Sequence, residues 1–202
     1  MMTKSIVASV CLSSSLLGAD NVTQSTNELG LKLYQDLSKE GENLCFSPYS
    51  IQSALSMVSN GAAGKTAKEM QYALQHKVPL NQMNSSFKEY RESLAKRLAK
   101  SEAHLKKEER LQLSVANKLF GKAGYPIKKN FLESLKQSYD APLESLDFGT
   151  APEPSRKLIN AWVSDQTQKK IKNLLPAGSI TPLTKLVLTN CLHCKAARQR
   201  SL

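Results

Sequence analysis

The sequence has few cysteines, few acidic residues and no apolar run long enough to cross a membrane. Four cysteines, nine glycines and eight prolines among 202 residues exclude a disulfide-dense miniprotein and a collagen-like chain. A hydrophobic content of 41% excludes a wholly disordered chain. Only 17 Asp and Glu accompany 28 Lys and Arg, so the net charge is +11. This excess favours acidic partners but does not determine the fold.

Complete motifs for catalysis are also missing. Residues 61–66, GAAGKT, are similar to a phosphate-binding loop, but that motif needs glycine at position 59, where the chain has Ser59. A glycine helix stop followed by a threonine N-cap explains the same residues. His76 and His104 lie in polar stretches, which predicts solvated rings, and His193 has no acidic residue near it in sequence. We therefore predict that the chain is not an enzyme and takes no cofactor.

The cysteines do not predict a metal centre. Cys191 and Cys194 form one Cys-Leu-His-Cys pair, whereas structural zinc takes four ligands and the sequence holds no second pair. Cys45 lies in a short apolar run, which predicts a buried free thiol. No metal site is therefore expected.

Residues 1–19 differ in composition from the rest of the chain. Lys4 is their only charged residue, and apolar and small residues follow it up to Gly18 and Ala19. This pattern predicts a secretory signal peptide, with a simple N-terminal tail as the alternative. The expected location is secreted and extracellular, or periplasmic in a bacterium, without a membrane anchor.

Helical and strand-like patterns mix along the remaining chain, which predicts an α+β fold. Ser25 with Glu28, and Thr66 with Glu69, are spaced as capping boxes and predict helix starts. Ser47 followed by a proline predicts another helix start. The buried stripe expected on that helix consists of Ile51, Ala54, Leu55 and Val58. The expected strands cover residues 44–46, 111–120 and 142–148 and begin again at 186.

Basic residues gather in residues 88–110, where eight basic and five acidic side chains give a net +3. A contact with a polyanion such as heparin or nucleic acid is one reading, and an ordinary solvated helix face is the other. At about 100° per residue these cations spread around a helix, and apart from Tyr90 no aromatic residues are interleaved with them for base stacking. Lys169, Lys170 and Lys172 form a smaller cluster with the same two readings. The candidate polyanion contacts are Lys88, Arg91, Lys96, Arg97 and Lys100.

Several short segments, in their order and spacing, resemble the serpins, a family of serine protease inhibitors. The resemblance covers about residues 25–190, and the chain is similar to the first half of a serpin, from its first helix to the third strand of the large central sheet. It implies a partial serpin fold, with N-terminal helices packed on part of that sheet. The matching segments are NLCFSPYSI at 43–51, ALSM at 54–57, GAAGKT at 61–66, ANKLF at 116–120, INAWV at 159–163 and LVLTN at 186–190.

The resemblance implies a mechanism and a set of site residues. In a serpin, the target protease cleaves an exposed reactive loop, which then inserts as a new strand into the central sheet and carries the acyl-linked enzyme with it. Ser47, Ser50 and Asn190 match the family's shutter positions beneath that sheet, and Ser47 can act as an N-cap at the same time. Asn160 and Trp162 match the helix that crosses the sheet. Serine proteases are the implied partners.

The sequence departs from the family pattern after Asn190. Cys194 and Arg198 occupy positions where the family has phenylalanine and tryptophan, and the reactive loop is absent from this chain. We expect a truncated serpin domain over residues 20–190 and a divergent basic tail over 191–202. We also expect the chain to be non-inhibitory by itself, with a binding module for polyanions as the alternative function. An unpaired third strand would favour self-association.

Overall fold

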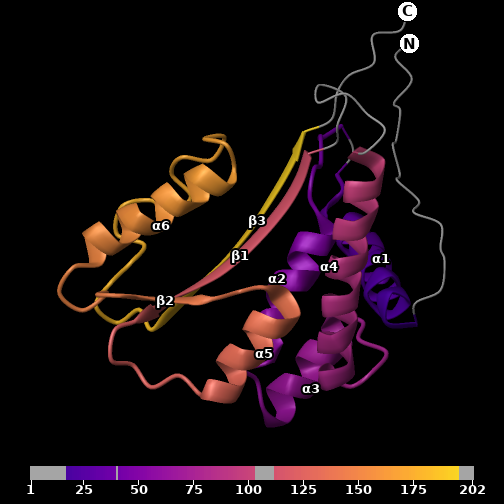
Figure 1. Ribbon diagram of the computed structural model, residues 1–202, viewed down its shortest axis with the longest axis horizontal. Helices are drawn as coiled ribbons and strands as arrows, with labels where there is room; N and C mark the ends of the chain where they lie inside the picture. The colour runs from indigo at the N-terminus through magenta and orange to yellow at the C-terminus, as the bar shows by residue number, and fades with distance from the viewer. Residues whose placement is uncertain (1–16, 40, 103–111, 196–202) are drawn as a thin grey trace, which may run out of the picture.

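The computed structural model describes residues 17–39, 41–102 and 112–195 (Figure 1). Within these ranges the chain forms six helices and three strands, which confirms the predicted α+β class. No helix in the described ranges is both long and apolar enough to span a membrane. The elements are α1 (Leu17–Leu37), α2 (Pro48–Ser59), α3 (Gly64–Ala73), α4 (Leu80–Glu102), β1 (Gln112–Lys122), α5 (Lys129–Tyr139), β2 (Leu143–Leu146), α6 (Pro152–Gln166) and β3 (Leu186–Lys195).

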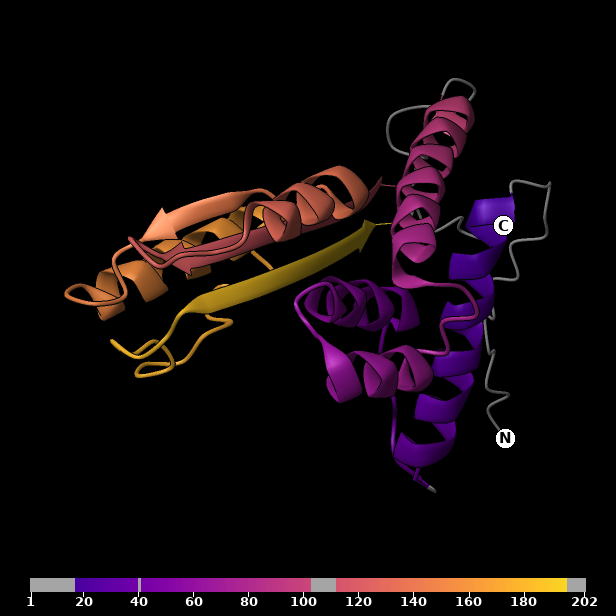
Figure 2. The same cartoon turned by 90° about the horizontal axis from the view of Figure 1, so that it is seen from below.

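The three strands form one sheet in the order β2-β1-β3. β1 runs parallel to β2 and antiparallel to β3, and the antiparallel ladder holds ten residue pairs, from Gln112↔Lys195 to Gly121↔Leu186. α6 lies along one side of the sheet, and α1 to α4 lie together on the other (Figures 1 and 2). β3 therefore forms an edge of the sheet in the described part of the chain.

Two apolar clusters pack on the two faces of the sheet. Leu119 of β1 is buried among residues of α2, α4 and α5, including Met57 and Leu135. The next residue, Phe120, is buried on the α6 side with Ile159 and Phe148. Side chains alternate between the faces of a strand, so these adjacent residues join the two halves of the core.

The helix starts were predicted correctly at one of three positions. Ser47 caps α2, because its Oγ accepts a hydrogen bond from the Ser50 N–H at 3.2 Å. The start predicted at Ser25 is wrong, because Ser25 lies inside α1, where its hydroxyl donates to the Gln75 carbonyl at 2.8 Å. The start predicted at Thr66 is also wrong, because α3 begins at Gly64. At Ser25, packing between α1 and the segment after α3 outweighs the local capping signal.

The buried face of α2 also differs from the prediction. Leu55 and Val58 are 41% and 47% exposed. The opposite, mostly polar face is buried instead, because Gln52 Nε2 donates to the Leu74 carbonyl at 2.9 Å and Ser56 Oγ lies 3.0 Å from His76 Nε2. The predicted stripe rests on the helical spacing of apolar residues, whereas contacts with the segment after α3 decide which face of α2 is covered.

Three of the four predicted strands are present, and the one at 44–46 is not. Leu44 and Cys45 are exposed, so the predicted buried thiol is wrong as well. A strand needs a neighbour for its backbone hydrogen bonds, and the described residues place no strand beside this segment. β3 extends to Lys195, so residues 191–195 of the predicted tail continue the sheet. His104 lies outside the described residues.

Candidate functional site

A pair of asparagines joins the edge strand to the rest of the sheet. Asn190 of β3 lies opposite Asn117 of β1, and its Nδ2 donates to Asn117 Oδ1 at 2.7 Å. Asn117 Nδ2 in turn donates to the carbonyl of Tyr139, at the end of α5, at 2.8 Å. Asn117 is buried and Asn190 is partly buried, so these bonds satisfy polar groups that have little access to water. The pair ties β3 to β1 and to α5.

The hydrogen bonds continue from this pair into the helices. Tyr139 Oη donates to Asn84 Oδ1 at 2.8 Å, and Asn84 Nδ2 donates to Asn60 Oδ1 at 2.7 Å. Asn60 Nδ2 donates to the Ser56 carbonyl at 2.9 Å. With the contact between the Ser56 hydroxyl and the His76 ring, a series of polar contacts, which we call the polar chain, links β3 to α2 and the segment after α3, passing through the backbone and the ring of Tyr139. Its members are Asn190, Asn117, Tyr139, Asn84, Asn60, Ser56 and His76.

Burial keeps the titratable members of the polar chain uncharged. Desolvation raises the pKa of Tyr139 and lowers the pKa of His76 to about 4. The prediction of a solvated His76 is wrong, because only 7% of this residue is exposed. Near neutral pH both side chains therefore act as hydrogen-bonding groups and not as charges. The arrangement is suited to holding elements in register, not to moving protons.

The two serines predicted for the shutter lie at the start of α2, the helix that packs on β3. The Ser47 hydroxyl is used as the N-cap, and Ser50 Oγ is buried without a hydrogen-bond partner. Among the described residues, neither serine is hydrogen-bonded to Asn190. The structure thus places the three predicted residues on neighbouring elements, while the bonds to Asn190 come from Asn117, which the sequence reasoning missed. A polar residue in the middle of the strand pattern ANKLF was the available signal.

Asn160 and Trp162 both attach α6 to its surroundings. Asn160 makes two hydrogen bonds of 2.9 Å to the backbone of Leu175, through its Oδ1 and its Nδ2. The Trp162 ring packs edge-on against Phe120 with 5.8 Å between ring centroids. Lys118 adds to this contact, because its Nζ lies 5.5 Å from the centre of the Trp162 ring and 2.5 Å from a carboxylate oxygen of Glu144. α6 is therefore fixed at both its sheet side and its return segment.

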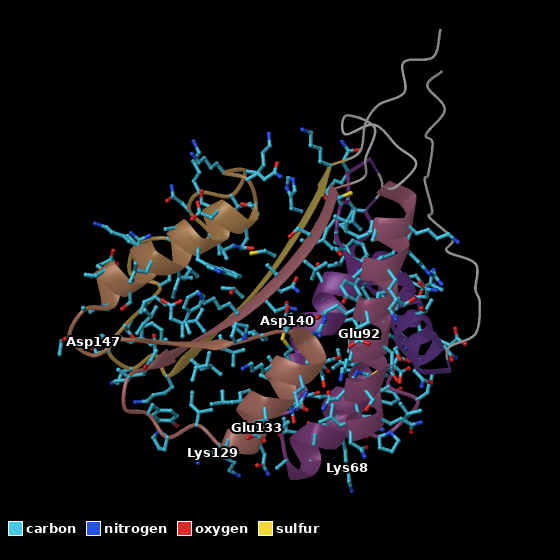
Figure 3. The ribbon with its side chains drawn as sticks, viewed as in Figure 1. Lys68, Glu92, Lys129, Glu133, Asp140 and Asp147 are labelled. Carbon is cyan, nitrogen blue, oxygen red and sulfur yellow. The ribbon has the colours of Figure 1, made fainter. Side chains whose placement is uncertain are left out.

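All five candidate polyanion contacts lie on α4, but they do not share one role. Arg91 donates to the carbonyls of Ser138 and Gln137 at 3.0 and 3.4 Å, so it caps the end of α5. Lys88, Lys96, Arg97 and Lys100 are exposed. The charged side chains labelled in Figure 3 are spread over α3, α4, α5 and the turn after β2. In the described ranges no three His, Cys, Asp or Glu side chains are grouped as metal ligands.

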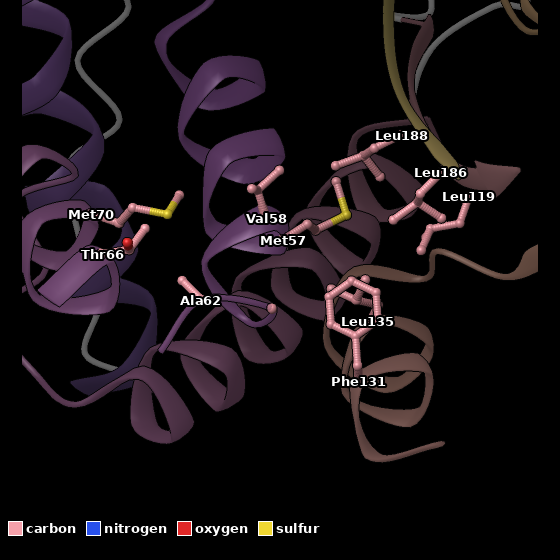
Figure 4. Close-up of a pocket in the computed structure, with 11 residues that line it drawn as sticks. Met57, Val58, Ala62, Thr66, Met70, Leu119, Phe131, Leu135, Leu186 and Leu188 are labelled. Atoms are coloured by element: carbon pink, nitrogen blue, oxygen red, sulfur yellow. The ribbon is translucent and has the colours of Figure 1, made fainter. Parts of the chain in front are cut away.

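An apolar cavity of about 360 Å³ opens between the helices and the sheet (Figure 4). Met57 and Val58 come from α2, Phe131 comes from α5, and Leu186 and Leu188 come from β3. Thr66 supplies its main polar group. The cavity has no charged lining residue, so it offers apolar surface and no chemistry.

The helices packed on a partial sheet define a class of mixed α and β fold, and the comparisons with known proteins show which family has it. The family model for serpins, serine protease inhibitors, matches residues 24–201. The chain is 35% identical to leukocyte elastase inhibitor of Xenopus tropicalis and 37% identical to serpin B6 of Bos taurus, over 87% of its own length in each case. The chain belongs to the serpin family.

Solved structures show the same relationship. Emu (Dromaius novaehollandiae) ovalbumin superposes with a TM-score of 0.74 at 28% identity, covering 87% of this chain and 47% of that one. The native stressed form of Arabidopsis AtSerpin1 gives 0.68 at 26% identity, covering 90% of this chain and 45% of that one. The chain spans about 45% of the length of the curated relatives named above. Serpins inhibit proteases and are not enzymes, in agreement with the prediction.

Proposed function

We propose that this chain supplies the strand-accepting part of a serine protease inhibitor. The observation that carries the proposal is the state of β3, which has ten ladder pairs on its β1 side and no strand on its other side among the described residues. A free strand edge presents unpaired N–H and C=O groups that can bond an added strand. The cleaved reactive loop of the complete inhibitor is the strand expected there.

The polar chain would keep β3 in place while a strand is added. Asn190 is bonded toward β1 by its side chain, so this attachment does not use the backbone groups of the open edge. Ser50 Oγ lies buried without a partner on the helix beneath. This hydroxyl is available to a polar group that arrives with a new strand, which is the role proposed for the shutter serines.

The strand-accepting edge can be tested with a peptide. A ten-residue extended peptide of alternating threonine and alanine should protect amides of residues 186–195 from hydrogen exchange, while a matched peptide with central prolines should not. The exchange of each strand is measured by mass spectrometry on the whole 202-residue chain. Equal protection by both peptides, or protection confined to the helices, contradicts the proposal.

These 202 residues would not inhibit a protease on their own. Among the described residues β3 has no strand on its outer side, and these 202 residues contain no segment that matches the bait loop of the family. When the chain is incubated with trypsin, chymotrypsin and elastase, no SDS-resistant complex should form. Bovine leukocyte elastase inhibitor with elastase is the positive control. A covalent complex formed by the chain alone would refute this part of the proposal.

The same open edge favours self-association. β3 carries no charged residue between Leu186 and Cys194, so it lacks the charges that usually protect an edge strand. Sedimentation velocity should therefore show an average mass that rises with concentration. The pairing peptide should compete with this association, because both use one edge.

A binding module for polyanions is the second candidate function. It rests on the four exposed cations of α4, Lys88, Lys96, Arg97 and Lys100. The chain should then stay on a heparin column at salt concentrations well above the one that elutes an unrelated protein with the same pI of about 9.5. If the chain elutes at the same salt concentration as the control protein, net charge alone explains its retention and the polyanion module is contradicted.

Secretion is proposed from the composition of residues 1–19. A charged start, an apolar stretch and small residues before position 20 support removal of this segment by a signal peptidase. Expression in a secretory host should release a chain into the medium that begins at Asp20. Retention of the uncut chain inside the cell would argue for an ordinary N-terminal tail.

A further inference from the structure

We propose that Asn60 is a site of spontaneous deamidation and that the polar chain controls how fast the reaction runs. Asn60 is followed by Gly61, and the sequence contains one asparagine–glycine pair, this one. Asparagine is one of the chemically labile residues of proteins. Glycine has no side chain, so its backbone nitrogen can approach the amide of the preceding asparagine closely. The sequence therefore marks Asn60 as the asparagine most open to this attack.

The reaction needs only water as a co-reactant. The backbone nitrogen of Gly61 attacks Cγ of Asn60, and an imide ring forms while the side-chain nitrogen takes up the displaced proton and leaves as ammonia. Water then adds to one of the two ring carbonyls and opens the ring. Opening at one carbonyl gives aspartate, and opening at the other gives isoaspartate, in which the backbone runs through the former side chain. Either product has a carboxylate where the neutral amide was.

The fold does not require glycine at position 61. The backbone of Gly61 is not in the left-handed region, unlike that of Gly64. A Cβ added to Gly61 would lie 3.4 Å from Cε2 of Phe131 and 3.5 Å from the carbonyl oxygen of Val58, which are ordinary contact distances. Gly61→Ala can therefore change the reactivity of the pair without disturbing the structure around it.

The folded backbone keeps the attacking nitrogen away from the amide. Asn60 is the C-cap of α2, with φ −65° and ψ −20°. At this ψ the Gly61 nitrogen does not lie beside the Asn60 Cβ, so ring closure requires a rotation about ψ. The Gly61 N–H also donates to the Val58 carbonyl at 2.9 Å, and the Asn60 N–H donates to the Met57 carbonyl at 3.2 Å. The attack must therefore break the turn that ends α2.

The polar chain also holds the amide group that would react. Asn60 Nδ2 donates to the Ser56 carbonyl at 2.9 Å and to Asn84 Oδ1 at 3.2 Å, and Asn60 Oδ1 accepts from Asn84 Nδ2 at 2.7 Å. Tyr139 Oη donates to the same Asn84 Oδ1 at 2.8 Å. Deamidation therefore requires a local opening at the end of α2. The rate of a reaction that needs such an opening follows the population of the open state.

Deamidation would in turn weaken the polar chain. A carboxylate accepts hydrogen bonds and donates none, so the product would lose the bond to the Ser56 carbonyl and place a negative charge beside that oxygen. The contact with Asn84 Oδ1 would lose its donor in the same way. This inference does not depend on strand acceptance, because neither Asn60 nor Gly61 belongs to β3.

Conversion of Asn60 can be followed in the whole 202-residue chain. The chain is incubated in mildly alkaline buffer with and without guanidinium chloride, and peptide mapping by mass spectrometry gives the fraction of aspartate and isoaspartate at position 60. Conversion should be at least about tenfold slower in the folded chain than in the denatured one. Gly61→Ala should slow it at least about tenfold in the denatured chain, because the added methyl group hinders the attack. Equal rates with and without denaturant, or no isoaspartate at position 60 in denaturant, would overturn the proposal.

Control by the polar chain is tested with neighbouring residues of α4. Asn84→Ala removes the side chain that is paired with Asn60, whereas Ser85→Ala changes an exposed neighbour. In the folded chain Asn84→Ala should speed conversion at least about fivefold and Ser85→Ala less than about 1.5-fold. Both variants should match the unmodified chain in guanidinium chloride, which shows that the intrinsic reactivity of Asn60 is unchanged.

Tyr139→Phe is a milder variant for the case in which Asn84→Ala impairs folding. It removes only the hydroxyl that bonds Asn84, and it should speed conversion about twofold in the folded chain. Circular dichroism at the incubation temperature confirms that each variant is folded. Rates in Asn84→Ala and Tyr139→Phe no higher than the rate in Ser85→Ala would refute control by the polar chain.

The effect of the product is tested with a substitution that reproduces its charge. Asn60→Asp is compared with Asn81→Asp, which adds the same charge at an exposed position of α4. Amide hydrogen exchange in residues 56–62 and 83–87 should rise at least about threefold in Asn60→Asp and stay unchanged in Asn81→Asp. Equal exchange in the two variants would refute the weakening of the polar chain by deamidation.

Discussion

Single amide side chains connect the sheet of this serpin chain to its helices. Asn117 holds the central place, because it accepts from Asn190 and donates to the Tyr139 carbonyl. Without Asn117 the buried Tyr139 carbonyl and the partly buried Asn190 amide would each be short of a hydrogen bond. An unsatisfied buried group costs more free energy than a bond between satisfied groups contributes.

Removal of Asn117 should therefore destabilise the chain strongly. Asn117→Ala leaves the Asn190 amide and the Tyr139 carbonyl without their partner, and we expect a loss of about 2–3 kcal/mol in the free energy of unfolding. Ser114→Ala, at an exposed position of the same strand, is the matched control and should change stability by less than about 0.5 kcal/mol. Urea denaturation followed by circular dichroism gives both values. A loss at Asn117 no larger than that at Ser114 would show that the bonds have no net effect.

His76 should make the stability depend on pH. Burial lowers its pKa to about 4 from an ordinary value near 6.5, so the unfolded chain binds a proton more readily between these values. The stabilising contribution of neutral His76 is complete above about pH 6.5 and is lost as the pH falls toward 4. Hydrogen bonds from Lys77 and Gln24 lower the pKa of the exposed Glu28, so its contribution also falls as the pH falls, equally in the two chains compared below.

Substitution of His76 should remove that dependence. His76→Gln keeps a hydrogen-bonding side chain but cannot take up a proton, so the midpoint of urea denaturation should change less between pH 6.5 and 4.5 than it does in the unmodified chain. The change of the urea midpoint with pH is compared between the two chains, so any effect of the substitution that does not depend on pH cancels. Parallel slopes would mean that His76 is protonated equally in the folded and unfolded states.

At the scale of elements, attachment of α6 to the sheet depends on few contacts. Trp162 against Phe120, with Lys118 beside both rings, forms the centre of this attachment. Trp162→Ala should cost about 2–3 kcal/mol, somewhat less than a fully buried tryptophan, because Trp162 is only partly buried. The same substitution should also increase the rate of amide hydrogen exchange in residues 152–166. Leu158→Ala, at a position 54% exposed on the same helix, should leave exchange unchanged, and similar effects of the two variants would contradict this account.

The same scale shows what could be predicted from the sequence. The N-cap at Ser47 was predictable because the capping serine and the following proline are local signals. The face of α2 was not, since Gln52 and Ser56 are buried through bonds to a segment about 20 residues away in sequence. Asn190 was found through the family motif, whereas Asn84 and Asn60 become partners only when α2 and α4 meet in space.

Over the described part of the molecule, exposed apolar side chains occur on several elements, and two of them lie on α2 beside the sheet. Leu55 and Val58 of α2 are exposed, and Val58 also lines the apolar cavity beside Leu186 and Leu188. Apolar surface gathered in one place favours binding of other apolar groups. Together with the open edge of β3, this region gives the folded chain two adjoining surfaces for association.

Two neighbouring residues of α2 can test whether this exposed surface matters. Val58→Lys should change the free energy of unfolding by less than about 0.5 kcal/mol, because the side chain already reaches solvent. It should reduce the fluorescence of the apolar dye ANS and the concentration dependence of the sedimentation coefficient. Met57→Lys, one residue away but fully buried, should cost several kcal/mol, because it buries a charge without a partner. If Val58→Lys left dye binding and association unchanged, association would have to use the β3 edge alone.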